Sequence, residues 1–438
     1  MFELLLFGVL VLFGFCYIKT GKDLLNPACI LSLFSLFAII VATSNYYYWE
    51  LKDYSWKTTA LFLLGMYSFA IGSLLATKRN MQSKAFYLRS HSNIGPIHIS
   101  KRAFVILHII MLLSFIVFLY FYRTQVSNFS AAMFAEFKEY RNDEDESLPT
   151  HINLIYKFIQ IFALLDMFIF INNVQFEKFW RNVGYLVTPV ILFVMALFVA
   201  NRGDILLFLM ASFSCWYIVQ LRVKGFGKRL RRKVVKSAAL LGGAFLIFFW
   251  LLVFLLQADN EVAQNSMLFY VSNYVSGPVA SFDLYIKQGG ESCQWWGQET
   301  FVTLNNNLAS FGLGHKSERF LEFRDTIGYA VTNIYSSFRR FYHDFGNEGL
   351  ILLSLFQGWI STRFYNYVLT KSFKSVIDFP LCVFCYLFYT IPYTFIDELF
   401  YSSNVSISGI YKIALFYIVY KAYFLTQKRQ NSLKIVKA

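Results

Sequence analysis

The stretch AFVILHIIMLLSFIVFLYFY, Ala103–Tyr122, holds a single residue, His108, that can become charged near neutral pH. A helix of about 20 apolar residues is long enough to cross the hydrocarbon core of a bilayer. Such runs recur along the chain, in which 57% of the residues are hydrophobic and only 15% are charged. A soluble protein of 438 residues would need more charge to cover its surface. The sequence therefore predicts an all-α polytopic membrane protein.

Eleven apolar spans are expected, and they divide the chain into three parts. Their expected bounds are 2–18, 29–48, 58–77, 103–122, 152–172, 183–200, 205–220, 237–256, 348–367, 376–395 and 406–425. The first eight spans form a membrane bundle over 1–256, with an external loop at 123–151. A large external loop over 257–347 precedes the ninth span, and 348–438 forms a second bundle with a basic tail.

The charges of the connecting segments predict the orientation of these spans. RVKGFGKRLRRKVVK, Arg222–Lys236, holds eight basic and no acidic residues, and the connection 78–102 holds six basic and none acidic. The loops 123–151 and 257–347 instead carry more acidic than basic residues. Because basic connections stay on the cytoplasmic side, the N-terminus is expected outside and the C-terminus inside. This topology accounts for the net charge of +14, and no nucleic-acid partner is expected.

A charged cluster ends the large loop, in TNIYSSFRRFYHDFGNEG, Thr332–Gly349. If this stretch is helical, Arg339 and His343 share one stripe, because residues four apart share a face. Arg340 and Asp344 share the next stripe. Arginine binds phosphate oxygens in a bidentate manner, and histidine or aspartate can accept a hydroxyl proton. The cluster therefore predicts a phosphate-bearing ligand, unless it is an interfacial helix whose arginines reach lipid phosphates.

A second charged element, Asn201–Asp204, separates two apolar runs at the outer interface. Arg202 in this tight turn would point into the helix bundle or at lipid headgroups. The alternative is an interfacial turn in which Arg202 and Asp204 pair with each other.

The large loop holds two further candidate features. HKSERFLEFRD, His315–Asp325, contains Arg319 and Arg324 and is expected to form a charged helix face. Trp295 and Trp296 could stack on sugar rings or anchor the loop at the membrane interface.

Three remaining features receive mainly structural interpretations. Asp166 and His108 lie inside apolar spans, where ionisable groups are functional candidates or bind helices together. The Asp-x-Asp pattern within Asn142–Glu146 is interpreted as an acidic turn, and no metal is assigned to the chain. Cys382 and Cys385 have CxxC spacing but lie within an apolar run, so they are expected to pack as small apolar residues.

The pattern T-N-x-Y-x-x-F-R-x-F-Y-x-D-F-G-x-x-G resembles the re-entry motif of bacterial oligosaccharide repeat-unit polymerases, the O-antigen polymerases called Wzy. Its positions here are Thr332, Asn333, Tyr335, Phe338, Arg339, Phe341, Tyr342, Asp344, Phe345, Gly346 and Gly349. The pair Arg202-Gly203 between two close spans is also similar to that family, as is one large external loop late in the chain.

The resemblance implies a GT-C-like glycosyltransferase in the bacterial inner membrane, with its active site facing the periplasm. Such an enzyme transfers a growing glycan from undecaprenyl pyrophosphate to the non-reducing sugar of an incoming lipid-linked repeat unit. Its partners would be the undecaprenyl-pyrophosphate-linked oligosaccharides that serve as donor and acceptor, the membrane lipids, and a chain-length regulator protein. Family members are taken to need no metal or other cofactor.

The resemblance also implies roles for the charged residues of the motif. The arginines expected to hold the pyrophosphate are Arg202, Arg339 and Arg340. His343 or Asp344 would accept the proton or orient the group that does. The remaining candidates are Arg319 and Arg324 for the second carrier lipid, and Asn333, Tyr335 and Tyr342 as further motif residues.

Two other functions remain open from the sequence. An O-antigen ligase uses the same donor but passes the glycan to lipid A-core, and the T-N-x-Y and D-F-G-x-x-G elements favour the polymerase over it. A lipid-linked oligosaccharide flippase or another transporter is an alternative of a different class. Against a transporter stand the long external loop, the absence of an internal repeat and the few charges within the spans.

Overall fold

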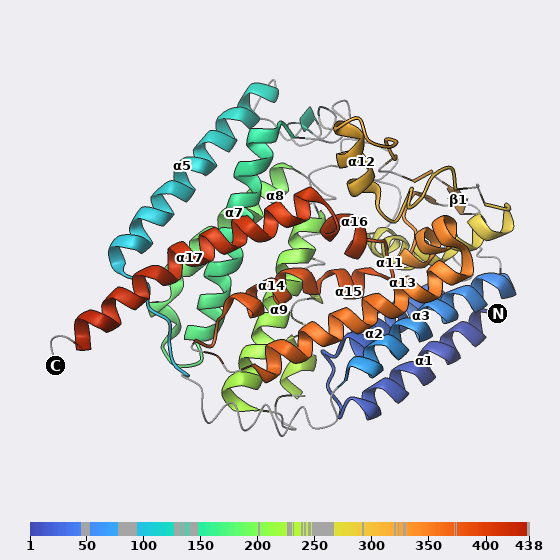
Figure 1. The fold of residues 1–438 in the computed structure, drawn as a ribbon, viewed down its shortest axis with the longest axis horizontal. Coiled ribbons are helices and arrows are strands. Elements are labelled where there is room, and N and C mark those ends of the chain that lie inside the picture. The colour runs from blue at the N-terminus through green and yellow to red at the C-terminus, as the bar shows by residue number, and fades with distance from the viewer. Residues whose placement is uncertain are drawn as a thin grey trace. The chain divides into compact units, whose positions relative to one another are not determined.

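The computed structural model shows a helical chain (Figure 1). It describes residues 1–44, 53–77, 94–126, 148–199, 202–225, 267–290, 293–318, 330–371 and 375–435, with single residues and short pieces between them. The helices are α1 (Phe2–Lys19), α2 (Pro27–Ser44), α3 (Trp56–Ala76), α5 (Lys101–Gln125), α7 (Thr150–Asn173), α8 (Val187–Phe198), α9 (Arg202–Lys224), α11 (Met267–Lys287), α12 (Val302–Ser310), α13 (Ser337–Thr370), α14 (Phe379–Phe388), α15 (Thr390–Tyr393), α16 (Phe400–Asn404) and α17 (Ile407–Ile435).

Short elements complete the described chain. The 3-10 turns η1 (Phe179–Arg181) and η2 (Val183–Leu186) precede α8. The strands β1 (Arg324–Thr326) and β2 (Ala330–Thr332) pair antiparallel, with Asp325 opposite Val331. The expected charged helix over His315–Asp325 is wrong, because the described residues before Arg324 are not helical and Arg324 itself begins β1. Hydrogen bonding to β2 takes the place of the helical pattern there.

Five of the described helices are long and apolar enough to cross a membrane: α1, α3, α5, α7 and the Gly203–Lys224 part of α9. α2, the turn η2 with α8, and α14 with α15 are shorter apolar helices. A helical chain with the apolar helices of a polytopic membrane protein is therefore confirmed. The count of eleven spans and the orientation stay predictions, and most of the expected span 237–256 lies outside the described residues.

The chain divides into two compact units. One comprises 1–81, 266–370 and 387–411, and the other comprises 82–265, 371–386 and 412–438. The first unit contains α1, α2, α3 and α13, whose packing can be followed in Figure 1. It also contains α11, α12 and the small sheet, so the expected large loop is itself largely structured.

The backbones of α3 and α13 lie in direct contact at two glycines. A Cβ atom on Gly72 would lie 1.9 Å from the carbonyl oxygen of Leu355, and one on Gly358 would lie 2.0 Å from that of Phe69. Small residues allow membrane helices to approach this closely, and packing contacts then replace the hydrophobic drive that is missing in lipid. The two glycines therefore set the distance at which α13 lies from α3.

Polar side chains bind the same helices together within the unit. The hydroxyls of Ser73 and Thr362 lie 2.6 Å apart, and Asn366 donates to the carbonyl oxygen of Ala76 at 2.7 Å. Tyr365 donates to Asp23 at 2.8 Å. Because each of these bonds joins α13 to another helix or to the segment between α1 and α2, they fix the register of α13 as well as its distance.

In the second unit, α5, α7, η2 with α8, and α17 meet at one buried carboxylate. Asp166 accepts hydrogen bonds from Thr188 at 2.5 Å and from Tyr423 at 2.7 Å. The Nε2 atom of His108 lies 3.2 Å from the same carboxylate. The two intramembrane ionisable residues of the sequence are thus partners. Their shared network supports a helix-binding role.

All six cysteines are free thiols. Cys382, Cys385 and Cys215 are completely buried. This burial agrees with the packing role expected for the CxxC pair.

The α3–α13 contact generates the first testable prediction. Gly358→Ala should lower the free energy of unfolding by about 1–3 kcal/mol, because the added methyl group meets backbone that cannot move aside. Gly14→Ala in α1 is the matched control, since no described atom outside the surrounding backbone of α1 lies within 4 Å of its Cβ position. It should be neutral or slightly stabilising, because alanine is the better helix former. Chemical unfolding of the two purified variants in detergent measures both changes in the free energy of unfolding. Equal changes in Gly358→Ala and Gly14→Ala would contradict the close contact.

Candidate functional site

The charged cluster lies on the first part of α13, which a break at Gly346 separates from the rest of the helix. Gly346 has φ 62° and ψ −154°, a conformation open almost only to glycine. Ser337 donates its backbone N–H to the carbonyl oxygen of Thr394 at 3.0 Å, and Phe338 packs edge-on against Phe62 of α3 at 5.1 Å. The expected helix over this stretch is confirmed from Ser337 onward, and these contacts fix where its side chains point.

Arg339 is enclosed by two carboxylates and two aromatic rings. Its guanidinium donates to Glu299 and, through Nη2, to both carboxylate oxygens of Glu322 at 3.0 and 3.2 Å. The guanidinium carbon lies 4.5 Å from the ring centre of Tyr285 and 4.6 Å from that of Tyr335. Its side chain is 1% exposed, so water has almost no access to it. Charge-assisted hydrogen bonds and cation–π contacts hold the guanidinium there.

Arg340 points to a different partner. Its Nε and Nη2 atoms donate to the two oxygens of Asp397 at 2.7 and 3.1 Å, which is the bidentate geometry that arginine adopts with carboxylates and phosphates. Its Nη1 atom donates to the backbone carbonyl of Glu299 at 3.3 Å. The segment after α15, which carries Asp397, is therefore joined to α13 and to the loop before α12.

His343 and Asp344 have different surroundings. The Nδ1 atom of His343 lies 3.0 Å from the hydroxyl of Tyr285, and its Nε2 atom lies 3.5 Å from Oε1 of Glu299. Asp344 accepts the backbone N–H groups of Glu299 and Thr300, the latter at 2.7 Å. The carboxylate of Asp344 thus fixes the loop before α12, while His343 faces other ionisable side chains.

Burial changes the proton affinity of two carboxyl groups near the arginines. It raises the pKa of Glu299 to about 7 in spite of Arg339 and Arg340. Burial also raises the pKa of Glu398 to about 7, although the backbone N–H groups of Tyr401 and Ser402 favour its ionised form.

The other predicted site residues do not all join this cluster. Tyr335 belongs to it, and its hydroxyl donates to the backbone carbonyl of Glu322 at 3.0 Å. Tyr342 is half-buried with the ammonium of Lys57 5.6 Å from its ring centre. Asn333 is half-buried in the segment before α13, and none of the contacts described around Arg339 and Arg340 involves it.

The three remaining arginines lie where their side chains are not described. Arg319 is outside the described residues, and Arg324 begins β1 with its side chain outside them. Arg202 begins α9 in the other unit, and its side chain is also outside the described part. Convergence of Arg202 with Arg339 or Arg340 therefore stays a prediction. The alternative partner expected for Arg202, Asp204, accepts a hydrogen bond from Gln160 at 2.8 Å.

Sequence reasoning missed four residues that complete the cluster. Glu299 and Tyr285 come from the large loop, and Asp397 comes from the segment between α15 and α16. Glu322 lies in the stretch His315–Asp325, which was expected to be a charged helix face. Asp397 and Glu398 form an acidic pair between two apolar runs, a signal that could have been matched to the arginine pair. Glu299 carried no such signal, because its partners lie 40 or more residues away.

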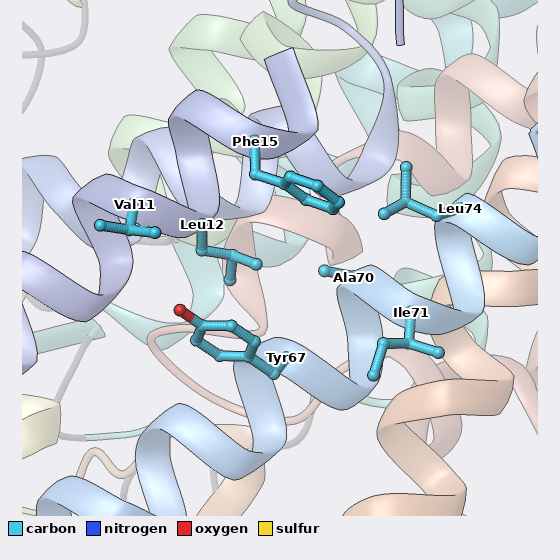
Figure 2. A pocket seen from close by; sticks show the side chains of 7 residues that line it. All are labelled: Val11, Leu12, Phe15, Tyr67, Ala70, Ile71 and Leu74. Carbon is cyan, nitrogen blue, oxygen red and sulfur yellow. The ribbon is translucent and has the colours of Figure 1, made fainter. Parts of the chain in front are cut away.

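A second feature of the first unit is a cavity of about 280 Å³ between α1 and α3 (Figure 2). Its walls are formed by Val11, Leu12, Phe15, Tyr67, Ala70, Ile71 and Leu74. None of these side chains is charged, and none belongs to the arginine cluster. An apolar groove of this kind suits acyl chains and offers nothing to hold a phosphate.

One group of described residues could hold a metal ion. The side chains of Cys293, His343 and Asp344 bring their ligand atoms within 4.8 Å of one another.

No family model, no curated protein and no solved structure matches this chain. The arrangement of its side chains is therefore the basis for assigning a function.

The pair Arg340–Asp397 generates a testable prediction on stability. Asp397→Asn should lower the free energy of unfolding by about 3 kcal/mol, because it leaves the guanidinium of Arg340 buried without its counter-charge. Glu348→Gln, an exposed acid further along α13, is the control and should change little. Chemical unfolding in detergent measures the free energy of unfolding of both variants. Similar decreases for Asp397→Asn and Glu348→Gln would contradict a tight ion pair between Arg340 and Asp397.

Glu398 generates a prediction on pH dependence. Its pKa rises from 4.5 to about 7 on folding, so the folded state binds the proton more tightly. The free energy of unfolding should fall by up to about 3 kcal/mol as pH rises from about 4.5 to about 7. Glu398→Gln should remove this part of the slope, whereas Glu348→Gln should keep it. Unfolding curves between about pH 4 and pH 8 test the prediction, and an unchanged slope in Glu398→Gln would refute it.

Proposed function

We propose that this protein is a membrane glycosyltransferase that polymerises lipid-linked oligosaccharides, as an O-antigen polymerase does. It would transfer a growing glycan from undecaprenyl pyrophosphate to the non-reducing sugar of an incoming lipid-linked repeat unit, on the periplasmic face of the bacterial inner membrane. The observation that carries the proposal is the pair Arg339 and Arg340 at the start of α13, with His343 one turn further along. The chain around them has the apolar helices of a membrane protein.

This reaction requires the protein to supply only two chemical functions. The donor already carries its leaving group, undecaprenyl pyrophosphate, so neither a nucleotide nor another energy source is needed. The enzyme must stabilise the negative charge that develops on the departing pyrophosphate and remove a proton from the acceptor hydroxyl. Two guanidiniums and a nearby imidazole supply both functions.

The carboxylates around the arginines indicate how a pyrophosphate would enter. Carboxylate and phosphate oxygens accept the same bidentate bonds from arginine. Glu322 and Asp397 are 32% and 24% exposed, whereas Glu299 is 7% exposed. A pyrophosphate would therefore replace Glu322 and Asp397, while Glu299 stays behind Arg339 and balances its charge.

His343 is the better candidate for the proton acceptor. The oxygens of Asp344 are engaged by backbone N–H groups of the loop before α12, which favours a role in holding that loop. The imidazole of His343 is oriented by Tyr285 and lies on the same helical face as Arg339. A proton acceptor must lie within hydrogen-bond reach of the hydroxyl of the acceptor sugar, and this requirement decides between His343 and Asp344.

The two alternatives receive different support. An O-antigen ligase would use the same donor and the same arginines, so it differs only in the acceptor. A transporter would need ionisable groups that can change partners within the spans, but Asp166 is engaged by Thr188, Tyr423 and His108. That arrangement favours helix packing over proton transport.

The proposal is tested with surface lipopolysaccharide from a strain that lacks this protein. Core bearing a single repeat unit is expected, and the wild-type gene should restore long chains. Arg339→Lys and Arg340→Lys keep the charge but lose the bidentate geometry, and each should lower polymerisation by about 10²–10³-fold.

The matched control for these variants is Arg222→Lys. Arg222 is an equally buried arginine, paired with Asp378 at 3.1 Å in the other unit. This variant should retain polymerisation. Bare core in the deletion strain would point to the ligase or the flippase instead, and full activity of both cluster variants would remove the site from the proposal.

A further inference from the structure

A thiol lies beside the charged cluster, on the loop that follows α11. Cys293 is half-buried, and its Sγ atom lies 3.7 Å from Oδ1 of Asp344. The thiol also donates to the backbone carbonyl of Trp295 at 2.9 Å. A ring nitrogen of His343 completes a set of three ligand atoms within 4.8 Å of one another. The three residue types are those that bind Zn²⁺ in proteins.

The separation between the thiol and the carboxylate suits a tetrahedral ion. With a Zn–S bond of about 2.3 Å and a Zn–O bond of about 2.0 Å, the sulfur and oxygen of a tetrahedral site lie about 3.5 Å apart. The observed 3.7 Å between Cys293 and Asp344 is close to that value. Because the single thiol proton is donated to Trp295, Oδ1 accepts the N–H of Glu299 among the described residues and retains a lone pair for a metal.

The histidine is held in the orientation that a metal ligand needs. Its Nδ1 atom hydrogen bonds with the hydroxyl of Tyr285, so Nε2 is the nitrogen that would bind. A metal-binding histidine almost always uses its second nitrogen in such a bond, which fixes the ring and its tautomer. Nε2 lies 3.5 Å from Oε1 of Glu299, and that oxygen or a water molecule can fill the fourth position.

We infer that Cys293, His343 and Asp344 form a site for a divalent transition metal ion, with zinc as the best chemical match. The thiolate and the carboxylate together balance the two positive charges of the ion, and the imidazole remains neutral. On binding, the thiol releases its proton to solvent and the sulfur exchanges its hydrogen bonds for the bond to the metal. Tyr285 acts as a positioning residue that orients His343.

This inference does not rest on the proposed role of the arginines, because its test is binding and not activity, but it competes with the role proposed for His343. The metal would bind the same imidazole that the glycosyl transfer is proposed to use. A filled site would therefore exclude the proton-accepting role of His343. Failure to bind a metal would leave the proposed role of the arginines unaffected. Full polymerisation by the arginine variants would likewise not contradict the metal site.

The test is titration of the purified full-length protein with Co²⁺, which reports a thiolate ligand through a sulfur-to-cobalt charge-transfer band and tetrahedral geometry through visible absorption. One equivalent should produce both signals, and Zn²⁺ should remove them by displacement. Cys293→Ser should abolish the charge-transfer band and His343→Gln should weaken binding at least tenfold. Tyr285→Phe, which removes only the orienting hydroxyl, should weaken binding by about 10–100-fold.

Cys16→Ser is the control for the thiol, since Cys16 is a buried cysteine of α1 outside the cluster. It should bind Co²⁺ as the wild type does, and a single symmetric elution peak confirms that each variant is folded. The site is refuted if the wild type gives no thiolate band at one equivalent. It is also refuted if the band survives in Cys293→Ser, or if His343→Gln binds as tightly as the wild type.

Discussion

A guanidinium removed from water must be compensated by the protein, and the surroundings of Arg339 are organised by this requirement. Two carboxylates and two aromatic rings enclose it, and they come from four separate places in the chain. Without Arg339, Glu299 would stay buried without its counter-charge, and breaking a buried pair in this way costs far more than never burying the pair. The loop before α12, the segment before β1 and the helix α11 are thus bound to the first part of α13 through this one side chain.

The bilayer sets the second constraint, because apolar side chains drive helices into lipid but give no preference for one helix over another. The contact of Gly72 and Gly358 supplies such a preference for α3 and α13. A fixed α13 in turn presents its first turns, up to the break at Gly346, to the loops that complete the cluster. The close backbone packing against α3 and the ion pairs of Arg339 and Arg340 therefore both fix the position of α13.

The sequence was sufficient for the features that depend on local pattern. The expected spans 103–122 and 152–172 lie within α5 and α7, and the charged stretch before Gly346 is helical as expected. The sequence-based prediction was wrong where pairing between distant residues determines the structure, as at Arg324, which was expected to be helical but begins a strand. Glu299 could not be found either, because no periodicity or spacing relates an isolated acid to an arginine far along the chain. The thiol of Cys293 likewise joins its neighbours only in the folded protein.

The carboxylates that hold the arginines are compatible with the proposed binding of a pyrophosphate. They stabilise the charged side chains before any ligand arrives, and the more exposed of them, Glu322 and Asp397, offer the geometry that a phosphate would copy. We propose that these arginines act on a lipid-linked pyrophosphate. Reconstitution of the purified protein in liposomes with a lipid-linked repeat unit as the sole substrate, followed by mass analysis of the products, tests this proposal. Glycans of increasing length should form together with released undecaprenyl pyrophosphate, without added nucleotide sugar. Repeat units that cross the bilayer or stay single would contradict it.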